Sequence, residues 1–177
     1  MTTITALQGL RPVGENTVRE NVGVGLDELT VGLVIEHRPG RTVTATDHTL
    51  MLALTGNPAP VHSDTQFCAA TGREKVLVCG IVTLGLVIGM TVRATSGLTS
   101  ANLALDDVRF EHPVHEGDTL YATTEVLEAR PSTSRPHEGV VTCRANGYNQ
   151  DSQRVLTFTR TFLVPADAAT VRSATNY

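Results

Sequence analysis

The sequence lacks three features, each of which would point to a particular class of protein. It has no excess of positive charge, because 14 lysines and arginines stand against 18 aspartates and glutamates, for a formal net charge of −4. This balance does not favour nucleic acid or an anionic membrane as a partner. Residues 1–21 lack the apolar stretch of a secretory signal. The only three cysteines, Cys68, Cys79 and Cys143, have spacings typical of neither a zinc site nor a disulfide framework. We therefore expect a cytoplasmic protein with reduced thiols and no bound metal.

The longest stretch without a charged residue runs from Val76 to Val92, between Lys75 and Arg93. A membrane-spanning helix needs roughly 20 apolar residues, and this stretch is shorter and contains Thr83 and three glycines. A helix that is apolar on all sides is also typical of a fully wrapped core helix. We therefore expect a buried helix over residues 80–94 and no membrane span.

The rest of the chain favours strands, and a coarse reading gives these elements. Strands are expected over 29–36, 41–45, 101–110, 119–129, 140–149 and 154–164, and short helices over 48–54 and 65–71. Pro39-Gly40 is expected to form a turn between the first two strands. Residues 119–126 alternate, with Leu120, Ala122, Thr124 and Val126 on one face and Thr119, Tyr121, Thr123 and Glu125 on the other.

One long apolar helix followed by a meander of strands has few good packings, because the sheet must bury one face. The sequence predicts an α+β hot-dog fold, an antiparallel sheet wrapped around a long central helix. The domain expected over 25–165 follows a loosely ordered arm (1–24) and precedes a frayed tail (166–177). An exposed edge strand often pairs across a two-fold axis, so we expect a homodimer or a higher homo-oligomer.

A polar turn stiffened by proline lies just upstream of the long helix and presents one histidine. The turn reads Thr55-Gly56-Asn57-Pro58-Ala59-Pro60-Val61-His62-Ser63-Asp64, and the helix is preceded by Val78-Cys79-Gly80. Both segments resemble the signature of the MaoC-like (R)-specific enoyl-CoA hydratase/dehydratase family, over about residues 27–165, and are most similar to its mesaconyl-CoA hydratase branch. Three positions depart from that signature. Asn57 stands where the family has its catalytic aspartate, Ala59 replaces an asparagine, and Cys79 replaces a histidine.

Hydration of a 2-enoyl thioester needs a base for water, an acid for C2 and a donor to the enolate-like oxygen. His62 can be the base because its ordinary pKa lies near neutrality, and the Gly80 N–H at a helix start can be the oxyanion donor. Asn57 cannot take a proton, but its amide can hold water or a carbonyl. The resemblance places Cys79 and Val61 beside the substrate.

Plainer roles stay open for the same residues. His62 could merely cap the turn, Asn57 could be a turn former, and Cys79 could be a buried small hydrophobe or a nucleophile. Asp47 and Asp64 fit helix caps better than acids. His112 and His115 flank a turn and should be solvated. Three arginines could meet a CoA phosphate or a substrate carboxylate: Arg109, Arg135 and Arg144.

The resemblance implies a hydro-lyase that adds water to, or removes it from, the C2–C3 bond of an acyl thioester. The acyl chain could be short and branched or dicarboxylic, and the carrier CoA or an acyl carrier protein. No cofactor is implied beyond the CoA or phosphopantetheine of the substrate. The alternatives are conjugate addition of a nucleophile such as an amine, a hot-dog thioesterase, and a binding module that holds a thioester without turnover.

Overall fold

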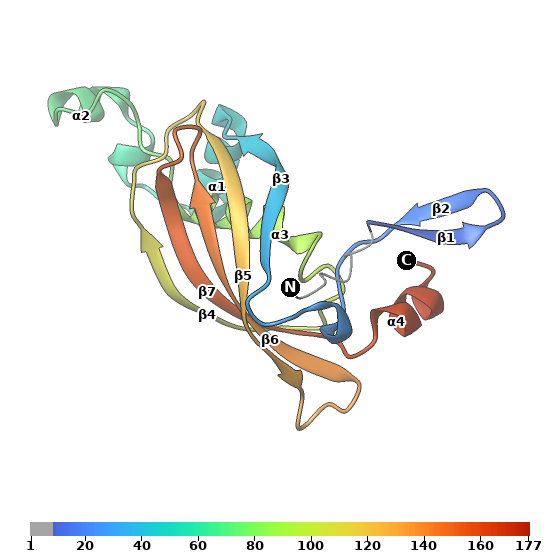
Figure 1. Ribbon diagram of the computed structural model, residues 1–177. Coiled ribbons are helices and arrows are strands. Elements are labelled where there is room, and N and C mark those ends of the chain that lie inside the picture. Colours follow the sequence, from blue (N-terminus) through green and yellow to red (C-terminus); the bar gives the residue numbers. More distant parts are fainter. Residues whose placement is uncertain (1–8) are drawn as a thin grey trace.

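The structure is a computed structural model, and it describes residues 9–177; the first part of the expected arm, 1–8, lies outside the described residues. A five-stranded antiparallel sheet has the order β3(Val34–Thr42), β5(Thr119–Pro131), β6(Glu138–Tyr148), β7(Arg154–Pro165), β4(Asn102–Phe110). The sheet curves around the helix α3(Gly80–Val92), which lies against its concave face (Figure 1). This arrangement confirms the hot-dog fold.

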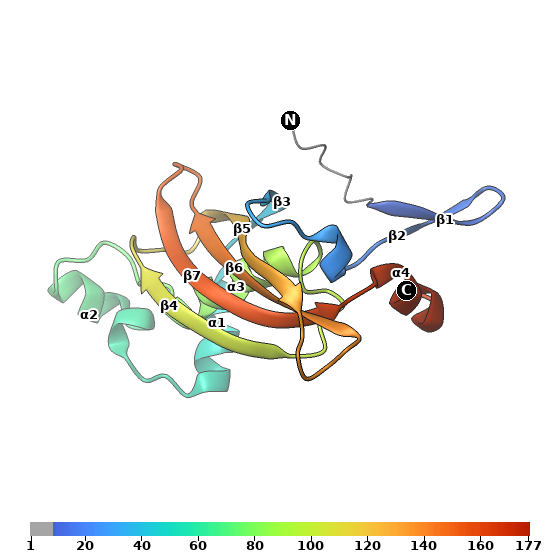
Figure 2. The same cartoon turned by 60° about the horizontal axis from the view of Figure 1, so that its bottom comes forward.

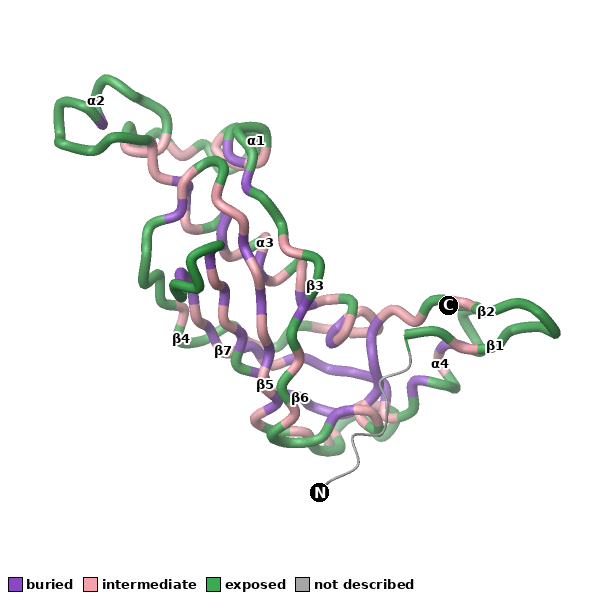
Figure 3. The backbone as a smooth tube through the Cα atoms, turned by 45° about the horizontal axis from the view of Figure 1, so that its top comes forward, coloured by how far each residue is buried: buried purple, intermediate pink, exposed green. Residues whose placement is uncertain are grey.

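The alternating strand β5 supplies much of the core, as predicted. Leu120, Ala122, Thr124 and Val126 are all buried, and the opposite face of the strand is partly exposed. The helix lies so close to the sheet that a Cβ on Gly147 would come within 2.7 Å of Val87. Buried residues follow the inner strands and are sparse at the end that carries the short helices (Figure 3). The turn over residues 55–64 is therefore held at the rim of the core.

Three helical segments lie between β3 and α3, and the two α-helices among them begin where the sequence has a capping side chain. Helix α1(Ala45–Thr55) starts at a capping box in which Thr44 and Asp47 satisfy each other's backbone N–H. It ends at Gly56, whose φ of 60° is in the left-handed region. The 3-10 turn η2(Pro60–His62) follows, and Asp64 accepts two backbone N–H bonds to start α2(Thr65–Ala70). Asp47 and Asp64 are thus helix caps.

The turn expected at Pro39-Gly40 is wrong, because β3 continues through it as one strand. The pairing of β3 with β5 shifts register between His37 and Arg41, so the extra residues form a bulge instead of a turn. A Cβ on Gly40 would meet the Tyr121 ring at 2.5 Å. The glycine therefore lets an aromatic side chain of the neighbouring strand lie against the bulge.

The described part of the arm and the C-terminal tail are also more ordered than expected. The strands β1(Leu10–Gly14) and β2(Thr17–Glu20) form a hairpin that extends away from the sheet (Figure 2). The 3-10 helix η1(Leu26–Glu28) packs against α4(Ala168–Thr175). Buried Arg172 of α4 donates to the Gly23 carbonyl at 2.6 Å and pairs with Glu28. This contact ties the tail to the domain.

Across residues 9–177, the helices all fall short of the length and apolar character that crossing a membrane requires. In the same part of the chain, acidic, histidine and cysteine side chains nowhere gather in a group of three or more that could hold a metal ion.

Candidate active site

His62 lies at the end of η2 with its ring fixed by one strong hydrogen bond. Its Nδ1 is 2.7 Å from the carbonyl oxygen of Leu77, which can only accept, so Nδ1 carries the proton. The Leu77 N–H in turn donates to the Val61 carbonyl at 3.0 Å, so the turn and the segment before α3 are joined in both directions. In the neutral ring, Nε2 therefore keeps a free lone pair. The Nε2 of this half-buried imidazole is therefore available as a hydrogen-bond acceptor.

Asn57 directly follows the C-cap glycine of α1, and its amide has a defined orientation. Oδ1 accepts the Ala59 N–H at 3.0 Å, while Nδ2 lies 3.5 Å from the Cys79 Sγ. Because the oxygen is occupied by the turn, the amide presents its N–H donors toward the start of α3. Cys79 is buried at 6% exposure in the core cluster and is the N-cap residue of that helix.

A second histidine, which the sequence analysis missed, lies beside His62. His48 in α1 is buried, and its ring is 6.0 Å from the His62 ring, centroid to centroid, in an edge-on arrangement. Its Nε2 accepts the backbone N–H of Cys79 at 3.2 Å. Burial lowers the pKa of His48, as does the charge of His62, while the Glu116 carboxylate acts in the opposite direction. His48 is therefore kept neutral and anchors the residue before Gly80.

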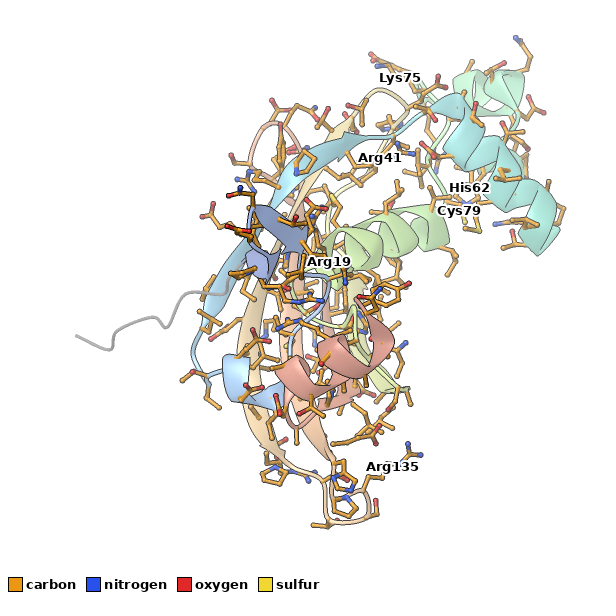
Figure 4. All side chains as sticks on the ribbon, turned by 90° about the vertical axis from the view of Figure 1, so that its right-hand side faces the viewer. Arg19, Arg41, His62, Lys75, Cys79 and Arg135 are labelled. Atoms are coloured by element: carbon orange, nitrogen blue, oxygen red, sulfur yellow. The ribbon has the colours of Figure 1, made fainter. Side chains whose placement is uncertain are left out.

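The start of α3 provides unused backbone donors. Val82 and Thr83 already donate to the Cys79 carbonyl, and the Cys79 N–H is held by His48. The Gly80 N–H, in the first turn, has no helical acceptor and carries the positive end of the helix dipole. A Cβ at Gly80 would lie 2.8 Å from the Phe110 ring, so glycine lets this ring of β4 cover the helix start. Figure 4 shows His62 and Cys79 together at this end of the helix.

A pocket of about 460 Å³ opens next to this cluster. Its walls come from the segment leading to α3 and from the turn after β4: Arg73, Glu74, Lys75, Leu77, Pro113 and His115. Leu77 is the residue whose carbonyl holds His62. His115 was expected to be solvated, but it is half-buried and its Nδ1 donates to the Val76 carbonyl at 2.8 Å. His112 is exposed, as expected.

The structure thus brings together the five residues predicted for the site: Asn57, Val61, His62, Cys79 and Gly80. The three predicted arginines do not join them around the pocket. Arg135 pairs with Glu138 and Arg144 with Glu125, and Arg109 lies on β4. Sequence reasoning missed the basic residues that do line the pocket. Their signal was available, since Arg73 and Lys75 are the charges that immediately precede the long uncharged stretch.

The fold and this cluster define a MaoC-like hot-dog protein with a histidine, on the turn η2, that lies near the start of the central helix. A family model described as mesaconyl-CoA hydratase matches residues 9–175. The chain therefore belongs to the mesaconyl-CoA hydratase family, and the resemblance seen in the sequence is confirmed.

Individual proteins agree with this placement. Mesaconyl-CoA hydratase of Cereibacter sphaeroides is 32% identical over 161 residues, which are 87% of this chain and 47% of that protein. The chain is 28% identical to a Mycobacterium tuberculosis protein with a double hotdog fold, with a TM-score of 0.75 and coverage of 82% and 45% of the two chains. The MaoC-like dehydratase of Rhodospirillum rubrum is 25% identical, with a TM-score of 0.67 and coverage of 81% and 97%. The chain spans about half the length of the Cereibacter sphaeroides mesaconyl-CoA hydratase.

Proposed function

We propose that this chain adds water to, or removes it from, the C2–C3 bond of an enoyl or 3-hydroxyacyl thioester. The observation that carries the proposal is the His62 ring. Its Nδ1–H is held by the Leu77 carbonyl, which leaves Nε2 as a base next to the unpaired N–H of a helix start. Membership of the mesaconyl-CoA hydratase family supports the same reaction and a short branched or dicarboxylic acyl chain.

The proton transfers can be assigned to one residue. His62 Nε2 takes a proton from water as the hydroxyl forms its bond to C3, and the C2=C3 electron pair moves toward the thioester oxygen. The Gly80 N–H donates to that developing oxyanion. The proton on His62 then passes to C2, so water is added and the base is regenerated. Dehydration follows the same steps in reverse.

Asn57 differs from the acid of the resembled enzymes, and its role is that of a donor. Its Nδ2 lies 3.5 Å from the Cys79 Sγ. Because sulfur is a weak acceptor, a water or a carbonyl oxygen can replace this contact. We assign the amide to holding the attacking water or the thioester carbonyl. Cys79 and Val61 line the substrate, with the buried thiol acting as a small apolar surface.

One observation favours a second candidate, a module that binds an acyl thioester without turnover. An amide stands at Asn57, where the family signature has a carboxylic acid, so a second titrating group is missing at that position. The test is incubation with crotonyl-CoA and mesaconyl-CoA. Loss of enoyl absorbance without free thiol is the result that we expect for a hydratase. Free thiol identifies a thioesterase, an adduct with an added amine identifies conjugate addition, and binding without change identifies a module.

We also propose that the working protein contains a second hot-dog unit, as a homodimer of this chain. Strand β4 is an edge of the sheet and exposes Leu103, Leu105 and Phe110, and such an edge invites pairing. The curated relative is about twice as long, and one solved relative has a double hotdog fold. Light scattering should give twice the chain mass, and Leu105→Lys should shift it to that of one chain. A wild-type mass of one chain at micromolar concentration would rule out the homodimer.

The substrate completes the proposal, and no further cofactor belongs to it. CoA or phosphopantetheine enters only as the carrier of the acyl group. The three cysteines are buried and unbridged, which suits a reducing compartment such as the cytoplasm.

A further inference from the structure

The pocket beside the segment that holds His62 carries a net positive formal charge. Arg73 and Lys75 line it, and neither takes part in any ion pair formed within residues 9–177. The Arg73 guanidinium donates to the Thr71 hydroxyl at 2.8 Å. The arginines at Arg135 and Arg144, in contrast, each have a carboxylate partner. Glu74 lines the same pocket and offsets one of the two positive charges of Arg73 and Lys75, so the net formal charge of the pocket is still positive.

One residue that lines the pocket also holds the candidate catalytic residue. Leu77 lines it and accepts the His62 Nδ1–H, while the neighbouring Val76 accepts a hydrogen bond from His115 in the opposite wall. Lys75 is two residues before Leu77, and two residues of chain span at most about 7 Å. Figure 4 shows Lys75 at the same end of the molecule as His62 and Cys79, and Arg135 at the opposite end.

We propose that this pocket binds an anionic group of the substrate through Arg73 and Lys75, and that Lys75 determines which thioesters are used. The inference rests on the proposed hydratase function, because the site it serves is that of His62. A lysine or arginine next to a carboxylate or phosphate oxygen forms a charge-assisted hydrogen bond, which is stronger than a neutral one. The anion is either a carboxylate at the far end of a dicarboxylic acyl chain or a phosphate of the CoA carrier.

The test compares Lys75→Ala with the wild type on four thioesters. Crotonyl and mesaconyl groups are each presented on CoA and on N-acetylcysteamine, so that the acyl carboxylate and the carrier phosphates vary independently. Loss of one charge-assisted contact should raise KM about tenfold for every substrate that carries the bound anion. It should leave kcat within about twofold, because Lys75 does not touch the reacting atoms. Lys75 is exposed, so folding should be unaffected.

The pattern across substrates identifies the anion. A KM increase confined to both mesaconyl thioesters assigns the pocket to the acyl carboxylate, and one confined to both CoA thioesters assigns it to a phosphate. Glu74→Gln should act in the opposite direction and lower KM for the same substrates, because it removes the negative charge of the pocket. Arg135→Ala, at the far end of the molecule, is the matched loss of positive charge and should change nothing. Unchanged KM values in Lys75→Ala for all four substrates would overturn the inference.

A binding measurement separates this inference from the proposed function. If the wild type turns over none of the four thioesters, the hydratase proposal fails. Calorimetric titration with mesaconate and with adenosine 3′,5′-bisphosphate then still tests the pocket. Binding of either probe that weakens in Lys75→Ala and not in Arg135→Ala supports an anion site. Equal binding by all three proteins, or none by the wild type, contradicts it.

Discussion

His37 on β3 should make the stability of the fold depend on pH in a way that one substitution can isolate. The side chain is 4% exposed, and its Nε2 lies 2.8 Å from the hydroxyl of Thr124 on β5. Burial lowers the pKa of His37 from its ordinary 6.5 to about 4, and the nearby Arg38 charge acts in the same direction. The folded protein therefore keeps this ring neutral at pH values where the unfolded chain has already bound a proton.

The sign and size of the effect follow from proton binding in the two states. Above pH 6.5 neither state is protonated at His37, and its contribution to stability is complete. Between pH 6.5 and about 4 only the unfolded state binds the proton, so stability falls as pH falls. Each pH unit corresponds to about 1.36 kcal/mol. Over the whole interval the free energy of unfolding therefore falls by roughly 3 kcal/mol. It falls no further once the pH is below the pKa of His37 in the folded protein.

Urea unfolding from pH 7.5 to pH 4.5 measures this loss in the wild type and in His37→Gln, which keeps a polar side chain but does not titrate. The wild type should lose roughly 2–3 kcal/mol more than the variant over this range, because the other titrating groups cancel in the difference. Thr124→Val is the control: it removes the hydrogen bond but keeps the imidazole, so its stability should be lower while its pH dependence persists. Parallel stability curves for the wild type and His37→Gln would show that His37 does not cause the pH dependence.

Two further predictions concern the site and the core. If the amide is a donor, Asn57→Ala should lower kcat/KM by an amount that corresponds to a barrier about 2–4 kcal/mol higher. Asn57→Asp should fold normally, raise activity on simple enoyl thioesters and add a second pKa to the pH profile of the rate. Steady-state kinetics across pH measures both, and two variants indistinguishable from wild type would reduce Asn57 to a turn former. Leu86 on α3 is half-buried against the hydrophobic core between the helix and the sheet. Leu86→Ala should therefore lower the free energy of unfolding by about 2 kcal/mol, at the low end for a leucine in a core. Urea unfolding measures this, and an unchanged midpoint would contradict the packing of α3.

The sequence predicted those features that depend on local pattern. The alternation in Leu120–Val126 placed the buried face of β5, and the signature turn placed His62 next to the start of α3. The bulge in β3 could not be predicted, because it depends on Tyr121 lying over Gly40 from another strand. A Pro-Gly pair read alone indicates a turn.

At the two ends of the fold and in the site, features set by local sequence could again be predicted, and contacts between distant residues could not. Asp167 caps α4 through two backbone N–H bonds, a signal that was present in the sequence and was not used. The contacts that hold this helix, from Arg172 to Gly23 and Glu28, join residues far apart in the chain and carry no local pattern. His48 was missed for that reason as well, since its role appears only when α1 lies against Cys79.

We propose that His62 performs the proton transfers of the hydration reaction, and a comparison of the wild type with one variant tests this role. Initial rates of mesaconyl-CoA hydration are measured for the wild type and for His62→Ala, with folding of both proteins verified by circular dichroism. We expect hydration by the wild type and a loss of about 10²–10⁴ in turnover for the folded variant. A folded His62→Ala protein with near wild-type turnover would contradict it.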